Sequence, residues 1–198
     1  MPAKTINAII ECSECEGLFV WQTSLLGIRY PGVLWTDLKF ESMNDKEPFI
    51  KCPHCGEVVE SEEANVIEMK KFLDFNLAEE EIECLFPTFE NYMNILKSKI
   101  LSNELEKKMR IATMHAFNDK RRNNDSDLEL TTAAKNNIIL LLPMCEHPLY
   151  IAELHRELGN FDEASRIMES IEEKESTIYK LIDKLIKEQS TKIDGAEY

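Results

Sequence analysis

Two Cys-x-x-Cys pairs, Cys12 with Cys15 and Cys52 with Cys55, are the side chains of this protein best suited to chemistry. Four thiolates in two such pairs match tetrahedral Zn²⁺, which binds sulfur at about 2.3 Å. Gly56 follows the second pair directly, and a tight turn that aims two sulfurs at one ion favours a positive φ at that position. The sequence therefore predicts a structural zinc ion bound by these four cysteines.

The second pair also has the spacing of a redox dithiol, because Cys52-Pro53-His54-Cys55 resembles the active site of strongly oxidising thiol oxidoreductases. In those enzymes the dithiol lies at the N-terminus of a helix, whose dipole and amides lower the pKa of the attacking thiol. Here a strand-like "EVVE" follows at residues 57–60, so a thiol oxidoreductase is disfavoured. Because four sulfurs already fill a tetrahedron, His54 is expected to be an exposed residue and not a ligand.

Iron is the remaining alternative for the metal. Rubredoxins resemble this chain in combining two Cys-x-x-Cys pairs with a glycine after the second, and ligand softness alone does not separate the two metals. A rubredoxin-like electron carrier therefore stays open. A metal with four thiolate ligands has no free position for water, and the sequence contains no Ser-His-Asp arrangement, phosphate-binding loop or clustered carboxylate pair. We expect the protein not to be an enzyme.

The composition is that of an ordinary soluble globular protein: 198 residues, 43% hydrophobic and 30% charged. The first ten residues contain a single lysine and only a brief apolar patch, unlike a secretion signal. The longest apolar run, at 138–144, is far shorter than the roughly 18 residues that a membrane helix needs. We therefore expect a cytoplasmic protein with no membrane association, in a compartment where thiols stay reduced.

The formal net charge of −14 makes nucleic acid an unfavourable main partner, because proteins that bind it usually carry a basic surplus. The charge is uneven, however, since residues 97–122 contain eight Lys or Arg against three Asp or Glu. This basic stretch is an alternative site for nucleic acid, or for another anionic partner. The candidate partner-binding residues in it are Arg110, Lys120, Arg121 and Arg122, together with Lys107 and Lys108.

The predicted fold class is α+β, with a small zinc-ribbon-like β head at 1–60 and a mainly helical body at 61–198. Short apolar runs broken by turns predict strands in the head, and apolar positions three and four residues apart predict helices after it, with no further strand. Expected helices cover 62–72, 89–101, 104–117, 130–142, 149–158, 162–173 and a last segment from Ser176, with a polar loop at 118–127.

A head of about 60 residues buries too little apolar surface to fold unaided, so metal binding is expected to supply part of its folding free energy. The aromatic residues Trp21, Trp35 and Phe40 are expected to pack against the metal site and the first helices.

Segment 148–173 resembles the tetratricopeptide helix hairpin. Small Ala152 lies in its first helix, Gly159 and Phe161 at its turn, and Ala164 where the second helix must approach the first closely. Gly159 is placed to end the first helix in a left-handed conformation. About one repeat is covered, and because isolated repeats are unstable the preceding helices are expected to complete the stack.

Four stretches together resemble a family of small bacterial proteins that join a zinc-ribbon-like head to a tetratricopeptide-like helical body. They are the four-cysteine start, "LWTDLKF" at 34–40, "AFNDKRR" at 116–122 and "AELHRELGNFDEA" at 152–164. The resemblance implies the fold but no activity or substrate. It marks as pattern positions Trp35, Asp37, Asn118, Asp119 and Arg122. Structural roles are expected there, with Asp37 and Asp119 at local turns.

The functional hypothesis combines the closed metal site, the lack of a catalytic constellation and the hairpin. It is a non-enzymatic zinc-binding scaffold or adaptor whose partner is a protein or a peptide. The oligomeric state is not indicated by the sequence.

Overall fold

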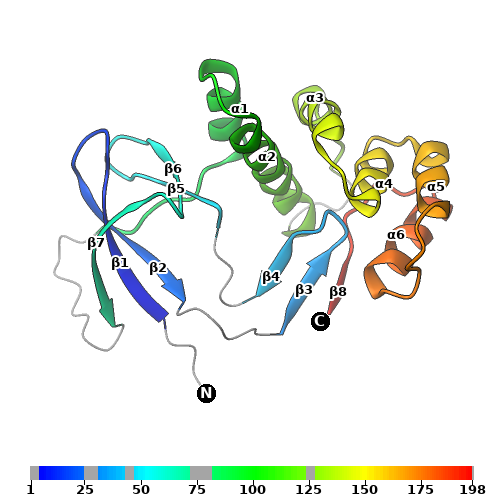
Figure 1. Cartoon of the computed structure of the whole chain (residues 1–198), viewed down its shortest axis with the longest axis horizontal. Coiled ribbons are helices and arrows are strands. Elements are labelled where there is room, and N and C mark those ends of the chain that lie inside the picture. Colours follow the sequence, from blue (N-terminus) through cyan, green and yellow to red (C-terminus); the bar gives the residue numbers. More distant parts are fainter. Residues whose placement is uncertain (1–4, 25–30, 43–46, 72–81, 124–127, 198) are drawn as a thin grey trace. The chain divides into compact units, whose positions relative to one another are not determined.

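The computed structural model describes residues 5–24, 31–42, 47–71, 82–123 and 128–197, and strands precede helices along most of them (Figure 1). The predicted α+β class is confirmed. Contacts divide the chain into two units: unit 1 contains Met1–Tyr30 and Ser42–Pro87, and unit 2 contains Pro31–Glu41 and Thr88–Tyr198. The boundary predicted at residue 60 lies inside unit 1 of this division.

Unit 1 contains two antiparallel sheets. The first has the order β2-β1-β7 and the second pairs β5 with β6. Their bounds are β1 (Thr5–Glu11), β2 (Leu18–Ser24), β5 (Phe49–Lys51), β6 (Val58–Glu60) and β7 (Asn65–Lys71). Small sheets of short strands are stable only when one face packs against a hydrophobic core, so the stability of unit 1 depends on where its core lies.

The core of unit 1 lies against one face of the three-stranded sheet. In β1, Ala8 and Ile10 point to this face because side chains alternate along a strand, and the register places Trp21 opposite Ala8 and Phe19 opposite Ile10. The second sheet contributes Ile50, which is fully buried. The cluster consists of Ala8, Ile10, Cys12, Phe19, Trp21, Ile50 and Cys52, so two of the cysteines belong to the apolar core.

Strand β7 contradicts the helix predicted at 62–72. It pairs with β1 along its length, with Ile10 opposite Val66 and Ile9 opposite Glu68, and the register shifts between Ile9 and Ile10. Ser61, expected to cap that helix, is buried and donates its amide to the carbonyl of Pro48. Pairing with a strand more than fifty residues earlier therefore outweighs the local helix propensity of this segment.

Unit 2 has a small sheet of its own, with the order β4-β3-β8. It is formed by β3 (Gly32–Trp35), β4 (Phe40–Ser42) and β8 (Gly195–Glu197). β8 is antiparallel to β3, with Ala196 opposite Leu34. The expectation that no strand follows residue 61 is therefore wrong at both β7 and β8, since each short strand pairs with a partner distant in sequence.

Six α-helices and one 3-10 helix make up the rest of the described part of unit 2. They are α1 (Phe89–Ser98), α2 (Asn103–Asn123), α3 (Thr132–Leu141), η2 (Leu142–Met144), α4 (Pro148–Glu157), α5 (Phe161–Glu169) and α6 (Thr177–Lys187). Ser176 caps α6 by accepting from the amide of Tyr179, as its position before the helix predicts. Gly159 follows α4 with φ of 79°, which confirms the predicted left-handed end.

Helix α2 runs six residues beyond its predicted end, through part of the segment expected to be a polar loop. Residues 118–123 are helical, and Asn118 and Arg121 within them are buried. The remainder of the predicted loop, 124–127, lies outside the described residues. Polar side chains continue this helix because their partners are other buried polar groups, which local sequence does not reveal.

Helices α4, α5 and α6 share a core in which α4 and α5 form the hairpin predicted from the sequence. Ala152 of α4 and Ala164 of α5 are both fully buried, and they pack with Met168 and Ile182. Small side chains at these two positions let the helix axes approach closely. The pattern predicted a helix hairpin correctly, while its likeness to a tetratricopeptide repeat stays a resemblance.

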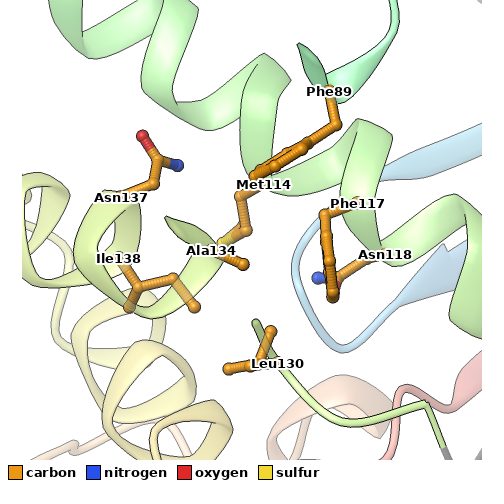
Figure 2. A pocket seen from close by; sticks show the side chains of 8 residues that line it. All are labelled: Phe89, Met114, Phe117, Asn118, Leu130, Ala134, Asn137 and Ile138. Atoms are coloured by element: carbon orange, nitrogen blue, oxygen red, sulfur yellow. The ribbon is translucent and has the colours of Figure 1, made fainter. Parts of the chain in front are cut away.

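Helices α1, α2 and α3 meet around aromatic side chains. The rings of Phe89 and Phe117 are 5.3 Å apart at their centres and inclined by 65°, an edge-to-face pair. Figure 2 shows Met114 beside them, with Ala134 and Ile138 from α3, around a small space. That space has no room for a water molecule, so it is a packing gap in the core and not a ligand pocket.

Candidate metal centre

The Sγ atoms of Cys12, Cys15, Cys52 and Cys55 all lie within 4.8 Å of one another. Cys12 Sγ is 3.6 Å from Cys55 Sγ, and Cys15 Sγ is 3.8 Å from Cys52 Sγ. In a tetrahedral site with metal–sulfur distances of about 2.3 Å, neighbouring sulfurs are about 3.8 Å apart. The arrangement can therefore hold one metal ion, and the prediction that the two pairs form one cluster is confirmed.

Two strand ends position the sulfurs. Cys12 comes directly after β1 and Cys52 directly after β5. After each of these two cysteines the backbone makes a tight turn and returns as the paired strand, which is β2 after Cys12 and β6 after Cys52. The two knuckles are thus the turns of two β-hairpins, and the ladders of both hairpins fix where the turns lie.

The two knuckles have the same hydrogen bonds. In the first, Cys12 N donates to Gly17 O and Glu16 N donates to Cys12 O, at 3.1 and 2.9 Å. In the second, the equivalent bonds of Cys52 join it to Glu57 and Gly56, at 2.8 and 3.0 Å. The residue after the second cysteine of each pair has a positive φ, 58° at Glu16 and 80° at Gly56. The prediction for Gly56 is confirmed, and Glu16 adopts a conformation that costs a non-glycine residue free energy.

Burial divides the cluster into two pairs. Cys12 and Cys52 are each 2% exposed and belong to the core of unit 1, whereas Cys15 and Cys55 lie at the surface. An ion at this site would be packed against the apolar core on one side and reachable from solvent on the other. It would therefore join the ends of both hairpins to the core they flank.

The thiols do not ionise equally. Burial works to raise the pKa of Cys12, but hydrogen bonds from the amides of Glu14 and Cys15 and from neighbouring thiols lower it to about 7. For Cys55, a hydrogen bond from the amide of Glu57 works to lower the pKa, but burial and the other three cysteines raise it to about 12. Negative charge accumulates as thiolates form side by side, which opposes further ionisation. A divalent cation removes this obstacle, so the cluster suits a bound metal ion.

His54 holds the two knuckles together without belonging to the sulfur cluster. Its Nε2 donates to the carbonyl oxygen of Leu18 at 2.9 Å, and the residue is exposed, as predicted. Its ring lies over Gly17, where an added Cβ would come within 2.6 Å of His54 Cδ2. Gly17 is therefore the residue that lets the histidine of the second knuckle pack on the first.

The predicted packing of aromatic residues against the metal site holds for Trp21, whereas Trp35 lies against Arg122 of α2. Trp21 is 6% exposed and belongs to the core around the buried cysteines. Trp35 instead lies in β3 of unit 2, where Nε1 donates to Glu41 at 2.8 Å. Phe40 is 37% exposed. The prediction assumed that the whole segment between the two cysteine pairs belongs to the head. Pro31–Glu41, which contains Trp35 and Phe40, belongs instead to unit 2.

The four candidate partner-binding residues of the basic stretch do not form one exposed surface. Each lies close to an acidic side chain, in the pairs Arg110–Glu106, Lys120–Glu90, Arg121–Glu157 and Arg122–Asp37. The arginine side chains are 9% exposed or less, and the Lys120 side chain is 55% exposed. The basic surplus that the sequence shows is thus largely neutralised inside unit 2, and an anionic partner would meet only Lys120 of the four.

Three arginines and three carboxylates form a buried ion network in unit 2, defined as Asp37, Arg121, Arg122, Glu153, Arg156 and Glu157 with Asn118. Arg122 pairs with Asp37, Arg121 with Glu157 at 3.1 Å and Arg156 with Glu153 at 2.6 Å. Asn118 Nδ2 lies 2.9 Å from Asp37 Oδ2 and 3.2 Å from Glu157 Oε1, so its amide links two of the carboxylates. The formal charges of the network cancel.

The network joins segments that are far apart in the sequence. Asp37 comes from the turn between β3 and β4, and the Arg122 guanidinium lies 5.3 Å from the centre of the Trp35 ring. Arg121 and Arg156 donate to the carbonyls of Thr191 and Ser190, which precede β8. Three pattern positions of the resemblance, Asp37, Asn118 and Arg122, therefore meet in this network, and Asp119 pairs with Arg122 at its edge. The expectation that Asp119 lies at a local turn is wrong, because Asp119 lies within α2.

The buried environment shifts the pKa values of Asp37 and Glu157 in opposite directions. Burial works to raise the pKa of Asp37, but His115, Arg122 and Asn118 lower it below its ordinary value. Burial, together with the nearby carboxylates of Glu153 and Asp37, raises the pKa of Glu157 to about 8. Although the formal charges of the network cancel, burial and two neighbouring carboxylates thus favour the protonated form of Glu157.

Sequence reasoning missed Glu153, Arg156 and Glu157. They lie three and four residues apart on α4, which puts them on one helix face, and this spacing is the signal that was present. The same spacing is usual on solvated faces, so it does not by itself indicate burial.

Comparisons with family models, with curated proteins and with solved structures gave no match to this chain. In the described part of the chain, no helix is both long and apolar enough to cross a bilayer. The four cysteines are also the one convergence of three or more His, Cys, Asp or Glu ligand atoms among the described residues.

Proposed function

We propose that this chain is a non-enzymatic protein in which one structural Zn²⁺, bound by Cys12, Cys15, Cys52 and Cys55, stabilises unit 1, while the helices of unit 2 bind a protein or peptide partner. The observation that carries the proposal is the set of four converging sulfurs, two of them buried in the core. Four thiolates complete the coordination of zinc and leave no position for a substrate.

The structural role follows from how little else holds unit 1 together. Its sheets have three and two strands, and two strands of three residues carry the second knuckle. Small domains of this kind commonly depend on a metal for part of their folding free energy. Cys12 and Cys52 lie where an ion would connect both hairpin ends to the same apolar cluster.

Metal analysis of the purified protein tests the metal. We expect one zinc per chain in a colourless protein, and cobalt substitution should give the absorption bands of tetrahedral thiolate coordination. Cys52→Ser should lose the metal, whereas the matched control Cys84→Ser, a cysteine outside the cluster, should retain it. Absence of bound metal from reduced protein would contradict the proposal. A red, iron-loaded protein would instead support the rubredoxin-like alternative, which the same four sulfurs suit.

Two features of the described residues support the proposal of an interaction protein. The gap between α1, α2 and α3 has no room for water, and the sulfur cluster is closed. Crosslinking in native cells followed by mass spectrometry should recover partner peptides attached to lysines of unit 2, such as Lys120. Metal-dependent turnover by the zinc-loaded protein, lost on Cys55→Ser without unfolding, would contradict the proposal.

Nucleic-acid binding is the weaker candidate, because three of the four basic residues predicted for it are buried in ion pairs. Fluorescence anisotropy with generic DNA and RNA at low salt should show no binding at micromolar concentrations. Salt-dependent binding that Lys120→Glu weakens would favour the nucleic-acid alternative.

A further inference from the structure

The four sulfurs come from two separate β-hairpins, so a metal ion keeps all four ligands only while the two knuckles stay together. Strands β1 and β2 carry the first knuckle, and β5 and β6 carry the second, so each ladder lies within one hairpin. The strands of the two hairpins are connected through one segment, because Glu83 bridges to Val20 of β2 and Leu85 bridges to Lys51 of β5. The turns are joined by a different contact, which a side chain makes.

That side chain is His54, which lies between Cys52 and Cys55 in the second knuckle. Its Nε2 donates to the carbonyl oxygen of Leu18 at 2.9 Å, and Leu18 is the residue with which β2 leaves the first knuckle. The bond therefore links the turn of one hairpin to the backbone of the other.

The absence of a side chain at Gly17 makes room for the His54 ring. An added Cβ would lie 2.6 Å from Cδ2 and 3.0 Å from Cγ of that ring, and 3.3 Å from Sγ of Cys15. Gly17 does not have the positive φ that Gly56 has, so its backbone conformation does not require glycine. The close approach of the ring and of the sulfur requires it instead. The contact between the knuckles therefore depends on two residue types, one in each knuckle.

We propose that His54 is a positioning residue of the metal centre, which raises the affinity for the metal ion and slows its release by holding the second knuckle on the first. This inference rests on the metal-binding function proposed above. Because the bond keeps the four sulfurs close before the ion arrives, less conformational freedom is lost on binding. A sulfur that dissociates from the bound ion also stays near it and rebinds before the others leave. His54 thus acts through the backbone of Leu18 and not as a ligand.

Transfer of zinc from the loaded, reduced full chain to an excess of a chromophoric chelator measures the rate of release. His54→Phe keeps an aromatic ring but has no donor, so release should become about two- to fivefold faster, as expected for the loss of one exposed hydrogen bond. His54→Gln keeps an N–H donor at the end of its side chain and should release zinc at close to the parent rate. Competition with the chelator at equilibrium should rank the affinities in the same order.

The matched control is Asn65→Ala. Asn65 Nδ2 donates to Glu11 Oε2 at 2.9 Å, so this variant also loses one exposed side-chain hydrogen bond of unit 1. The lost bond joins β7 to β1 and does not connect the two knuckles. Its zinc should therefore leave at the parent rate. Circular dichroism should show all the variants folded.

Gly17→Ala tests the packing of the ring. On its own it should accelerate release, because the added methyl group displaces the ring of His54. In a chain that already carries His54→Ala it should accelerate release by less, because only the tight contact with the Cys15 sulfur remains.

Four results would overturn the proposal. They are equal release rates in His54→Phe and the parent, release from His54→Gln as fast as from His54→Phe, equal acceleration by His54→Phe and Asn65→Ala, and fully additive effects of Gly17→Ala and His54→Ala. In each case a zinc-loaded parent leaves the proposed function intact. A reduced parent that binds no metal contradicts the proposed function, and this inference with it.

Discussion

The two units of this molecule bury polar groups in opposite ways. Unit 1 places four cysteine sulfurs together, two of them in its core, and these groups repel one another once ionised. Unit 2 buries three arginines with three carboxylates, so its charges are compensated by the chain itself. The cluster of unit 1 can therefore hold a cation from outside the chain, whereas the carboxylates of unit 2 are paired with arginines of the same chain.

The comparison explains why the two clusters differ in what they reveal. The four-cysteine cluster can be recognised in the sequence, because metal ligands of one residue type occur there in closely spaced pairs. A cluster that compensates itself can draw its members from several distant segments. The first is visible in the sequence and the second is not.

Metal removal should produce the largest effect and should be confined to unit 1. Stripping the proposed zinc under reducing conditions removes a binding free energy of about 10–16 kcal/mol for sites of this kind. Hydrogen exchange followed by mass spectrometry should show amides of β1, β2, β5 and β6 losing protection, while those of α4 and α6 keep theirs. Returning zinc should restore the protection. Unchanged protection in β1 would show that the cluster is not what stabilises unit 1.

Breaking the ion network on one side should be the next largest effect. Arg122→Met leaves the buried carboxylate of Asp37 without its main counter-charge and should cost about 3–5 kcal/mol of unfolding free energy. The matched control is Arg166→Met, because Arg166 is 71% exposed and paired with Glu163 at the surface, where an ion pair contributes about 1 kcal/mol or less. Urea denaturation of both variants checks the difference, and equal losses would argue against the burial of the network.

Glu157→Gln should change the pH dependence of stability. The pKa of Glu157 is raised from 4.5 to about 8, so the folded protein keeps a proton that the unfolded chain has released. Its contribution is therefore fully present below about pH 4.5 and is lost as the pH rises to about 8. Glutamine stays neutral throughout.

The variant should accordingly match the parent near pH 5 and exceed its unfolding free energy by about 2–4 kcal/mol at pH 8. Urea denaturation at several pH values measures this gain. A variant less stable than the parent at pH 8 would show that Arg121 requires a charged partner. Because the charge of Asp37 contributes to the raised pKa of Glu157, the difference between the two proteins measures this coupled pair of carboxylates and not Glu157 alone.

Substitutions at the positive-φ residues of the two knuckles should change the unfolding free energy in opposite directions, and these effects should be the smallest of the series. Gly56 has φ of 80°, so Gly56→Ala should cost about 1 kcal/mol. Glu16 occupies the equivalent position with φ of 58°, so Glu16→Gly should relieve strain and gain up to about 1 kcal/mol. Thermal unfolding of the metal-loaded protein measures both. Losses in both variants would mean that the Glu16 side chain contributes more than its backbone conformation costs.

The candidate site could be predicted from the sequence because its determinants are local. Residue type and a two-residue spacing located all four cysteines, and Gly56 indicated the turn geometry of one knuckle. The positive φ of Glu16 was not predictable, because glutamate gives no sign of it. The role of Gly17 depends on the ring of His54, which belongs to the other knuckle.

Helices and their ends were predictable where caps are local, as at Ser176 and Gly159. The prediction failed where a distant segment decides the structure. β7 is a strand because β1 offers a ladder, and α2 continues through Asn118–Arg122 because Asp37 and Glu157 satisfy its polar side chains. A sequence window that contains only one side of such a contact shows polar residues without partners and favours a loop.

The assignment of Pro31–Glu41 to unit 2 has a consequence for the order of synthesis. This segment leaves the ribosome long before its partners, since Asn118 follows Asp37 by 81 residues and Asp194 follows Thr36 by 158. The segment therefore cannot make these contacts until the rest of unit 2 has been synthesised. Cys15 and Cys52 flank the segment, so early closure of the sulfur cluster would turn the intervening chain into a loop with restrained ends. Pro31–Glu41 would then lose less conformational entropy when it packs against the helices of unit 2. Metal binding by unit 1 would in this way favour the later folding of unit 2.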